Sequence, residues 1–438
     1  MSLRLLEGSF WNAPPAAPEP PLEGEQRADV AIVGGGLTGL CAALALREAG
    51  ADVALVEREF CGAGASGRNA GHLTPTIGKD LPTLVRRFGA ARAGALARFA
   101  ERAVDEAEAL VRRHAIACDY VAAGNVLAGL HAGQRRRLER AAEVAARLGA
   151  KLAFLDEAEV RRRALPGFVR FGVLEERGGT LDPGKLVAAL RAAALARGCR
   201  LYEGSEVHRI AAGAAPRVDA GLGSLRAERI VLATNAYTPA TLGRMRHRLV
   251  PLRVTLFATR ALAAAERAGL GWPGREGLYT AHEVLESWRL TADGRLLGGS
   301  RWLRYGFGSA LAPADSPRQL RRFADLLAER FPELGAPIDA FWGGWIGVTL
   351  DFLPLLGARG PVHHGLAYNG HGIAQACLFG RLLAEAVLGR ASEEAELLRR
   401  REIPLPPEPF RWALARAILG SLELVDAFSD RALRRRRD

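Results

Sequence analysis

Three glycines and one glutamate near the amino terminus have the spacing of a nucleotide-binding turn. Gly34, Gly36 and Gly39 follow the GxGxxG pattern, and Glu57 lies eighteen residues beyond Gly39. Glycines at these positions permit a tight turn and let the backbone approach a pyrophosphate, while an acid in this place accepts hydrogen bonds from an adenosine ribose. An acid rather than an arginine argues against a 2′-phosphate. The chemistry indicated is the binding of FAD or NAD.

The elements that must position these residues form one βαβ unit. A buried strand from Val30 to Val33 precedes the turn, and an Ala-rich helix from Leu40 to Glu48 follows it. A second strand, Val53 to Val56, then delivers Glu57. The free N–H groups and positive end of the helix would face the phosphates. Because the elements occur in this order, a dinucleotide site is favoured over a fortuitous glycine turn.

Two further stretches have the composition of a cofactor surface. Residues 62–73 are rich in glycine and small residues, which lets the backbone lie against a flat ligand, although a flexible loop is the alternative. A predicted strand at 366–369 leads into Gly370–Gly372 and a helix from Ile373 to Leu388. This second strand, turn and helix would offer another helix amino terminus to a partly negative group.

The rest of the chain supplies the scaffold. Residues 12–26 contain five prolines and predict an extended lead-in, with regular structure starting near Ala28. We predict helices over 81–115, 134–150 and 183–198, and strands over 207–210 and 229–233. Alternating residues at 250–257, 287–290 and 295–299, with a hairpin turn at Asp293 and Gly294, predict an antiparallel sheet beneath a substrate pocket.

Bulk composition narrows the class of protein. The 438 residues suit two or three domains, and the net charge is +12. The arginines are scattered among glutamates without a recognition motif, so we predict no nucleic-acid partner. The five cysteines form no CxxC pair and have no zinc spacing, which predicts reduced thiols and no metal site. With neither a signal segment nor a window of eighteen apolar residues, a cytoplasmic protein is expected.

Short motifs along almost the whole chain resemble one superfamily. They are Ser-Phe-Trp at 9–11, the βαβ unit, Ala-Ser-Gly-Arg-Asn-Ala-Gly at 65–71, Leu-Asp-Pro at 181–183, Ala-Thr-Asn-Ala-Tyr at 233–237, Thr349 with Asp351, Gly-His-Gly at 370–372, and Leu-Pro with an apolar helix after 404. In this order they are similar to the D-amino-acid-oxidase-like (DAO) superfamily of FAD enzymes, which includes glycine and sarcosine oxidases. Within it, the chain most resembles the gamma-glutamylputrescine oxidase group.

The resemblance implies an α/β fold of two parts. A discontinuous Rossmann-like FAD-binding domain would comprise residues 27–85, 172–245 and 340–400. A substrate domain with a mixed antiparallel sheet and helices would comprise residues 86–171 and 246–339. Residues 1–26 would be the lead-in and residues 401–438 an amphipathic helix with a basic tail.

The resemblance also implies which residues hold FAD. Gly34, Gly36 and Gly39 would hold the pyrophosphate, with Glu57 at the adenosine ribose. Ser66, Arg68 and Asn69 would lie near the pyrophosphate and flavin, and Gly370 to Gly372 would face the pyrimidine end of the ring. The other residues assigned to the cofactor site are Leu37, Thr38, Arg58, Gly64, Ala65, Ala70, Gly71, His72, Val207, Ala233, Thr234, Asn235, Gly347 and Ile373.

The chemistry implied is hydride transfer from the carbon next to an amine to flavin N5, giving an imine that water hydrolyses. Arg289 is a candidate for binding the carboxylate of an amino-acid substrate, against the alternative of a solvated strand arginine. His371 is a candidate acid or base, against a purely hydrogen-bonding role at its turn. The partners implied are a small amine or amino acid and an electron acceptor.

Some positions depart from the pattern of the relatives. Gly344 and Asn69 stand where some relatives attach flavin through Cys or His, so non-covalent FAD is expected, although His72 lies close by. The lysine that assists oxygen reduction in some relatives would fall near Leu296, and none of the three lysines is near it. Oxygen is the expected acceptor, and a quinone or carrier at a membrane surface is the alternative. A flavin-binding protein without turnover is a third interpretation.

The final stretch has an apolar face of its own. Phe410, Leu414, Ile418, Leu422, Val425 and Phe428 recur at three- and four-residue steps, and Arg434 to Arg437 follow. In one interpretation this face docks on the protein's own FAD domain. In the other, the helix lies on an anionic bilayer, which gives peripheral membrane contact and suits electron delivery to a quinone.

Overall fold

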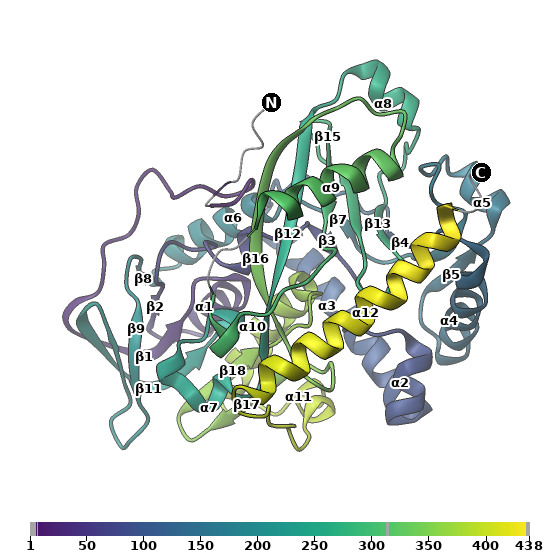
Figure 1. Cartoon of the computed structure of the whole chain (residues 1–438). Coiled ribbons are helices and arrows are strands. Elements are labelled where there is room, and N and C mark those ends of the chain that lie inside the picture. Colours follow the sequence, from purple (N-terminus) through teal and green to yellow (C-terminus); the bar gives the residue numbers. More distant parts are fainter. Residues whose placement is uncertain (1–5, 7, 312–314, 435–438) are drawn as a thin grey trace.

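The computed structural model describes residue 6 and residues 8–311 and 315–434. Within these residues there are two eight-stranded sheets and one two-stranded sheet. In Figure 1 the two large sheets lie side by side, and the long C-terminal helix α12 (Phe410–Arg434) crosses the front of the molecule. No helix in the described part of the chain is long and apolar enough to cross a membrane.

The first sheet contains the βαβ unit, which consists of β1 (Glu23–Val33), α1 (Leu37–Glu48) and β2 (Val53–Val56). The strand order is β17-β18-β11-β1-β2-β8, and all neighbours except β17 and β18 run parallel. Its other strands are β8 (Arg200–Tyr202), β9 (Val207–Ala211), β10 (Arg217–Ala220), β11 (Leu222–Leu232), β17 (Leu355–Arg359) and β18 (Val362–Leu366). This order brings the carboxyl ends of β1, β2 and β11 together, where ligands bind in such sheets.

One face of this sheet is covered by α1, α3 (Ala90–Arg113), α6 (Pro183–Ala196) and α10 (Gly372–Val387), which share one apolar core. The helices α1 and α10 approach closely at Gly380, where an added Cβ would lie 2.3 Å from the Cβ of Cys41. The first turn of α6 is capped by Asp182, whose side chain accepts a hydrogen bond from Lys185 N. These contacts hold the amino ends of α1 and α10 on the same side of the sheet.

The second sheet has the order β16-β12-β15-β14-β13-β4-β6-β5 and is antiparallel except between β13 and β4. Its strands are β4 (Asn125–Gly129), β5 (Leu152–Leu155), β6 (Phe171–Glu175), β12 (Val250–Ala261), β13 (Gly277–Thr280), β14 (Ser287–Leu290), β15 (Arg295–Gly299) and β16 (Ile338–Val348). Helix α9 (Pro317–Arg330) packs on one face through Phe323, against Phe257 and Phe341. The opposite face is covered in part by Phe10 and Trp11, which pack against Trp342, and it borders a pocket elsewhere.

The remaining elements are short or peripheral. The helices are α2 (Leu81–Phe88), α4 (Arg135–Leu148), α5 (Glu157–Arg162), α7 (Gly243–Arg246), α8 (Ala264–Leu270) and α11 (Glu393–Leu398), and the two-stranded sheet pairs β3 (His72–Leu73) with β7 (Gly179–Thr180). Single 3₁₀ turns occur at Ala65–Gly67, Ala132–Gln134, Asn235–Tyr237, Ala240–Leu242 and Phe307–Ser309.

Most predicted elements are present, and several boundaries differ. The strand expected at 30–33 begins already at Glu23, because residues 23–28 pair in parallel with 222–227 of β11, so the lead-in is not wholly irregular. The strand expected at 366–369 instead ends at Leu366. In the domain division, α3 packs against α10 and shares the apolar core of the first sheet, whereas β6 and most of β16 belong to the second. Sheet pairing, which local patterns do not encode, decides these assignments.

Candidate cofactor and substrate site

A cavity of about 510 Å³ runs from the carboxyl ends of β1 and β2 to the second sheet and α12. Its first part is lined by the GxGxxG turn, Glu57 and residues 64–72. Its second part is lined by apolar side chains of β12 and β16, including Val254, Leu256 and Ile346. The cavity therefore has a nucleotide-like end and an apolar end.

The turn at the nucleotide end depends on its glycines. Gly34 has φ +107°, and a Cβ there would lie 2.9 Å from Ala233 O. A Cβ on Gly39 would lie 2.0 Å from Gly34 O, so Gly39 serves the packing of helix on strand and does not line the cavity. Helix α1 starts after Gly36 with no side-chain cap and no acid in its first turn. Such a helix end suits a pyrophosphate.

Glu57 lies at the end of β2 and its carboxylate is held by backbone N–H groups. One oxygen accepts from Gly35 N at 2.7 Å and the other from Glu59 N at 3.1 Å. Burial raises the pKa of Glu57, while these two N–H groups lower it. Each carboxylate oxygen has a further lone pair, and Glu57 lines the cavity, so ribose hydroxyls would find acceptors here.

Hydrogen bonds hold residues 64–72 in shape along the cavity. Arg68 donates from Nε to Ala63 O at 2.5 Å and from one terminal nitrogen to Gly343 O at 3.1 Å. Asn69 donates to Ser66 O at 2.8 Å and accepts from Gly71 N at 2.9 Å. Both side chains therefore rigidify a backbone that lies against the cavity, which fits a flat ring system.

Two asparagines join strand ends at the far side of the cavity. Asn235 accepts from Ala367 N at 2.9 Å, and a Cβ on Gly347 would lie 2.4 Å from Asn235 Oδ1. Gly347 thus makes room for this contact and does not itself line the cavity. Asn369 accepts from Thr349 N at 3.0 Å, and its buried Nδ2 has no partner within the described part of the chain. An unpaired buried donor beside the cavity fits a ligand carbonyl.

His371 immediately precedes α10 and lines the cavity. Its Nδ1 lies 3.3 Å from Thr74 Oγ1, and its ring centroid is 6.4 Å from that of Tyr279. Burial, with a smaller contribution from the charge of Lys79, lowers the pKa of His371 to about 4. At neutral pH the imidazole is therefore uncharged and can accept a hydrogen bond.

Arg289 does not have the position expected of a carboxylate-binding residue. Its side chain is 1% exposed, and it does not line the cavity. One terminal nitrogen donates to the carbonyls of Ala70 and Gly71, at 3.3 and 3.2 Å, and also to Leu181 O. In this structure Arg289 therefore holds the 70–71 turn from behind, and the solvated interpretation is wrong, whereas substrate binding by Arg289 stays a prediction.

Several lining residues were not among the predicted ones. Lys79, whose Nζ lies 4.1 Å from the centroid of the Phe352 ring, brings a cation to the cavity. Tyr279 of β13 also lines it, with Glu175 behind. Burial raises the pKa of Glu175 to about 7 despite its interaction with Tyr279, although neither Tyr279 Oη nor Glu175 Oε2 has a well-aligned hydrogen-bond partner. No motif marks these residues. For Tyr279, the alternation of a short strand does not tell which face borders a cavity, and Lys79 lies outside any helix or strand.

Every residue predicted at the cofactor site lines this cavity except Gly39 and Gly347, which act through packing, and His371 lines it too. Among them, Leu37 N donates to Ser66 Oγ at 2.9 Å, linking the turn to the second stretch. His72 is half-buried, its buried Nε2 has no hydrogen-bond partner among the described residues, and desolvation lowers its pKa to about 3. The open helix end, the glycine cradle and the unpaired Asn369 amide fit a dinucleotide. The fold and site define a dinucleotide-binding α/β protein with an adjoining apolar pocket.

Comparison with known proteins narrows this class. A family model described as FAD-dependent oxidoreductase matches residues 29–386. The chain is 31% identical over 417 residues to a probable oxidoreductase OrdL of Rhizobium meliloti, covering 93% of this chain and 94% of that protein. It is 30% identical over 382 residues to the gamma-glutamylputrescine oxidoreductase of Escherichia coli, covering 86% and 88%. The chain therefore belongs to the DAO family of FAD-dependent oxidoreductases, and the predicted family and cofactor are confirmed.

Solved structures share the fold. Glycine oxidase from Geobacillus kaustophilus superposes with a TM-score of 0.70 at 24% identity, covering 86% of this chain and all (100%) of that one. L-amino acid deaminase from Proteus myxofaciens gives a TM-score of 0.70 at 17% identity, covering 90% and 97%. The predicted α/β architecture with a Rossmann-like part and a second sheet is confirmed.

Proposed function

We propose that the protein oxidises the C–N bond of an amine or an N-substituted amino acid. Bound FAD would supply the chemistry, taking up a hydride at N5 from the carbon next to the nitrogen and leaving an imine that water hydrolyses. The observation that carries the proposal is the continuous cavity from Glu57 to His371 and Tyr279. The printed names of relatives, which include a gamma-glutamylputrescine oxidoreductase and a glycine oxidase, support it.

The protein's own contribution would be orientation and exclusion of water. A substrate amine must be neutral when it reacts, because its lone pair assists hydride loss. The low pKa of His371 keeps this imidazole uncharged, so it would not repel a protonated amine on arrival. Tyr279 lines the cavity with Glu175 behind it, and burial raises the pKa of Glu175 to about 7, so this carboxylate would take a proton from the arriving amine through the Tyr279 hydroxyl.

Oxygen is the acceptor that we propose first. A cation near the site of reduction stabilises negative charge that develops on oxygen, and Lys79 brings one to the cavity. A quinone or carrier at a membrane is the second candidate, supported by the apolar side chains of α12 beside the cavity.

An anaerobic screen tests the function. Amines and N-alkyl amino acids are mixed with the FAD-loaded protein under argon, and bleaching of the visible flavin band is the expected result. If no amine bleaches a flavin that dithionite does reduce, amine oxidation is excluded and a non-catalytic flavin-binding role gains support. We further expect acid to release FAD from the polypeptide, because Gly344 and Asn69 stand at the attachment positions; flavin that stays on the denatured chain would instead direct mapping to His72.

Reoxidation of the reduced protein separates the acceptors. Air and a soluble quinone are compared for the native chain and for Lys79→Met, with the exposed Lys151→Met as the matched control. We expect Lys79→Met to slow reoxidation by air and to leave bleaching by the amine nearly unchanged. Rapid reoxidation by the quinone alone would favour the second candidate, in which the protein is a dehydrogenase that passes electrons to a quinone or carrier.

A further inference from the structure

Helix α12 exposes much of its apolar side to solvent, whereas an ordinary amphipathic helix buries that side against the protein. Its outward side chains are largely apolar: Phe410 is 69% exposed, Leu424 64%, Val425 54% and Phe428 66%. Toward the protein it presents Arg411 and Asp426, which are 5% and 1% exposed. The helix therefore docks on the protein through these polar side chains, which contact residues between 247 and 309 of the predicted substrate domain rather than the FAD domain. The predicted apolar face is divided: Leu414, Ile418 and Leu422 line the cavity, whereas Phe410, Val425 and Phe428 point outward.

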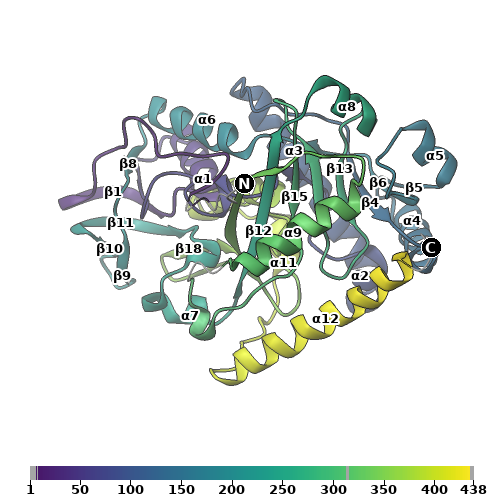
Figure 2. The ribbon, with the colours of Figure 1, turned by 45° about the horizontal axis from the view of Figure 1, so that its top comes forward.

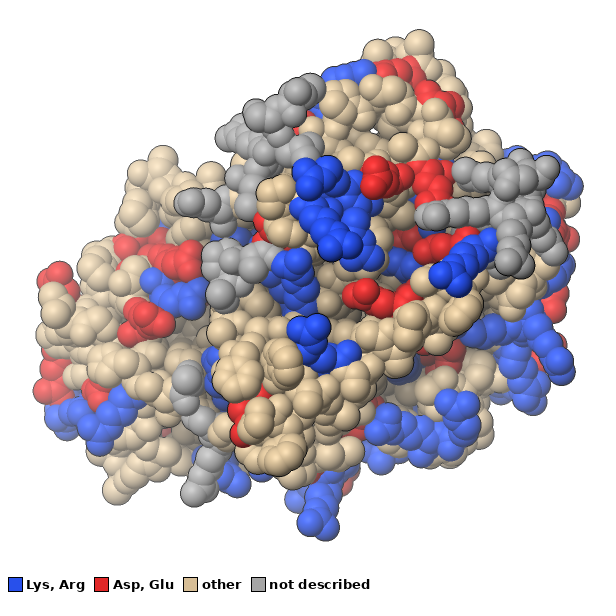
Figure 3. All heavy atoms as spheres, viewed as in Figure 1, with Lys and Arg blue, Asp and Glu red and all other residues tan. Residues whose placement is uncertain are grey.

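The charges of α12 are sorted between its two sides. Among its described side chains, the acidic ones (Glu423, Asp426 and Asp430) are buried or half-buried, whereas the exposed charges are Arg416 and Arg431. Arg416 lies over the Trp412 ring at 4.9 Å and Arg431 over Phe428 at 5.5 Å. The outward face is thus apolar and cationic. In Figure 3 the side chains along the course of α12 are mostly tan, with blue groups beside them.

Polar contacts fix this orientation at the C-terminal half of the helix. The carboxylate of Asp426 accepts from Glu283 N at 2.8 Å and from Val284 N at 3.0 Å, and pairs with Arg301 at 3.1 Å. Asp430 pairs with Arg301 at 3.0 Å and with His282 Nε2 at 3.1 Å. A rotation that buried the apolar face would break all of these contacts.

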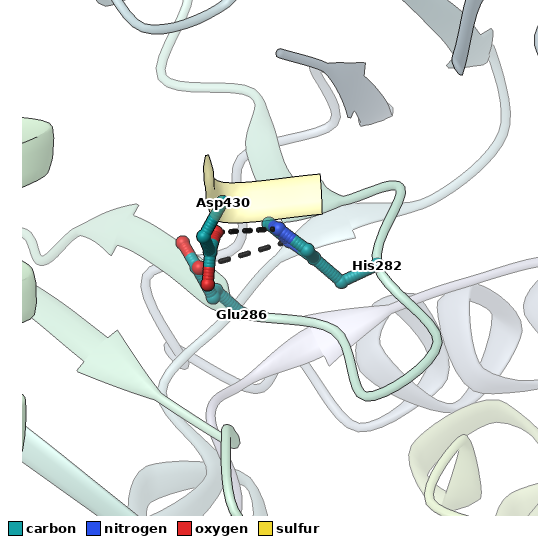
Figure 4. A group of neighbouring side chains, drawn as sticks. All are labelled: His282, Glu286 and Asp430. Carbon is teal, nitrogen blue, oxygen red and sulfur yellow. Dashed lines mark hydrogen bonds and ion pairs between the residues drawn. The ribbon is translucent and has the colours of Figure 1, made fainter. Parts of the chain in front are cut away.

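Asp430 also belongs to a cluster with His282 and Glu286, shown in Figure 4, whose residue types could ligate a metal. Arg330 already pairs with Glu286 at 2.8 Å, and Arg301 with Asp430, so the carboxylates are neutralised by the protein. The cluster serves as an anchor for α12.

The amino-terminal half is fixed in the same manner. Arg411 donates to Ser309 Oγ at 3.2 Å and contacts His247 Nδ1 at 2.9 Å. Between the two anchors, Leu414, Ile418 and Leu422 line the cavity, and the first two are also 41% and 43% exposed. The helix therefore borders the cavity and faces solvent along the same stretch. Figure 2 shows it at the outer margin of the molecule.

We propose that the outward face of α12 is a contact site for an anionic lipid bilayer. An apolar face flanked by arginines inserts at the level of the headgroups, where each arginine gains from anionic lipid. A second copy of the chain is the other conceivable occupant. An isologous dimer would bring Arg416 and Arg431 of each copy against the same cationic face, which is unfavourable. A bilayer at this face would lie next to the cavity, so the inference applies to either acceptor.

Vesicle sedimentation tests the proposal. The full-length FAD-loaded chain is spun with vesicles of phosphatidylcholine alone and of phosphatidylcholine mixed with phosphatidylserine. We expect sedimentation with the anionic vesicles, weakened by salt, and little with the neutral ones. Combining Phe410→Ser with Phe428→Ser should weaken binding at least about tenfold, because two large apolar side chains leave the bilayer. Neither residue lines the cavity.

Two controls make the test decisive. Leu222→Ser removes an apolar side chain that is 89% exposed on β11, and it should leave binding unchanged. The double variant Arg416→Glu and Arg431→Glu should lose the preference for anionic vesicles. FAD absorbance checks folding in each case. Absence of sedimentation, or equal sedimentation by the Phe410→Ser, Phe428→Ser chain, would overturn the proposal, as would a dimer in sedimentation velocity that this variant dissociates.

Discussion

At the scale of single residues, Glu57 illustrates how a half-buried acid is held in place for a ligand. Its carboxylate is held by Gly35 N and Glu59 N at the edge of the cavity. We predict that Glu57→Arg weakens FAD binding by about tenfold to about 150-fold, the loss of a charge-assisted hydrogen bond of about 1.5–3 kcal/mol. Equilibrium dialysis measures this change. The matched control is Glu59→Arg, at an exposed neighbour whose backbone N–H is retained; equal losses from both variants would contradict the role of Glu57.

The guanidinium of Arg289 suggests binding of a substrate carboxylate, whereas its burial and its contacts indicate a structural role. Its donors are directed to the carbonyls of Ala70, Gly71 and Leu181. Arg289→Leu should leave these acceptors unpaired and lower the free energy of unfolding by about 1–3 kcal/mol. Urea unfolding of the FAD-loaded protein gives this value. A normal stability together with a KM raised for acidic amines alone would support the substrate-binding role.

At the scale of elements, some features follow from local sequence signals, whereas others depend on contacts between distant segments. The βαβ unit, the hairpin at Asp293 and Gly294, and the turn before α10 could be predicted because glycine positions and hydrophobic period are local signals. The far wall of the cavity could not, since Lys79 and Tyr279 come from separate segments that only the tertiary fold brings together. The sequence also could not predict which side of α12 contacts the protein. The periodicity of Phe410 to Phe428 defines an apolar face, but it does not tell whether that face or the polar side chains of the helix contact the rest of the chain.

The anchor at Asp426 gives a prediction for α12 as a unit. Asp426→Ala removes the acceptor of two backbone N–H groups and leaves Arg301, whose side chain is 4% exposed, short of one partner. Breaking a buried pair costs about 3–5 kcal/mol, enough to release much of the helix. Limited trypsin digestion should then cut faster after Arg416 and Arg431. Glu423→Ala, at a half-buried acid one turn earlier, is the control; equal cutting in both variants would show that Asp426 is not the anchor.

At the scale of the whole molecule, the two sheets meet around a cavity that is lined by several titratable groups. His72 has a pKa of about 3 and His371 about 4, each because burial disfavours the imidazolium. His364, which lies away from the cavity beside Gly357, is lowered to about 4 for the same reason. Glu175 is the opposite case, with a pKa raised to about 7. The two imidazoles at the cavity are thus uncharged near pH 7, which suits a reaction of a neutral amine.

These shifts determine how stability depends on pH. Below the ordinary histidine pKa of about 6.5 the unfolded chain takes up protons that the folded chain refuses until about pH 4, so acid favours unfolding. Each group contributes up to about 1.4 kcal/mol per pH unit in this window. Glu175 opposes them, because the folded chain keeps a proton that the unfolded chain releases between about pH 4.3 and its folded pKa of about 7.

Among the described residues, five histidines have lowered pKa values, since burial also lowers those of His114 and His363, and three carboxyls have raised ones, since burial also raises those of Glu57 and Asp182. We therefore predict that the free energy of unfolding rises from pH 5 to pH 6.5. Urea titrations at fixed FAD concentration measure it. His364→Gln should flatten the rise without touching the cavity, whereas His208→Gln, at an exposed position of β9, should leave the slope as it is. A slope that is flat in the native chain, or identical in the His364 and His208 variants, would contradict the lowered pKa of His364.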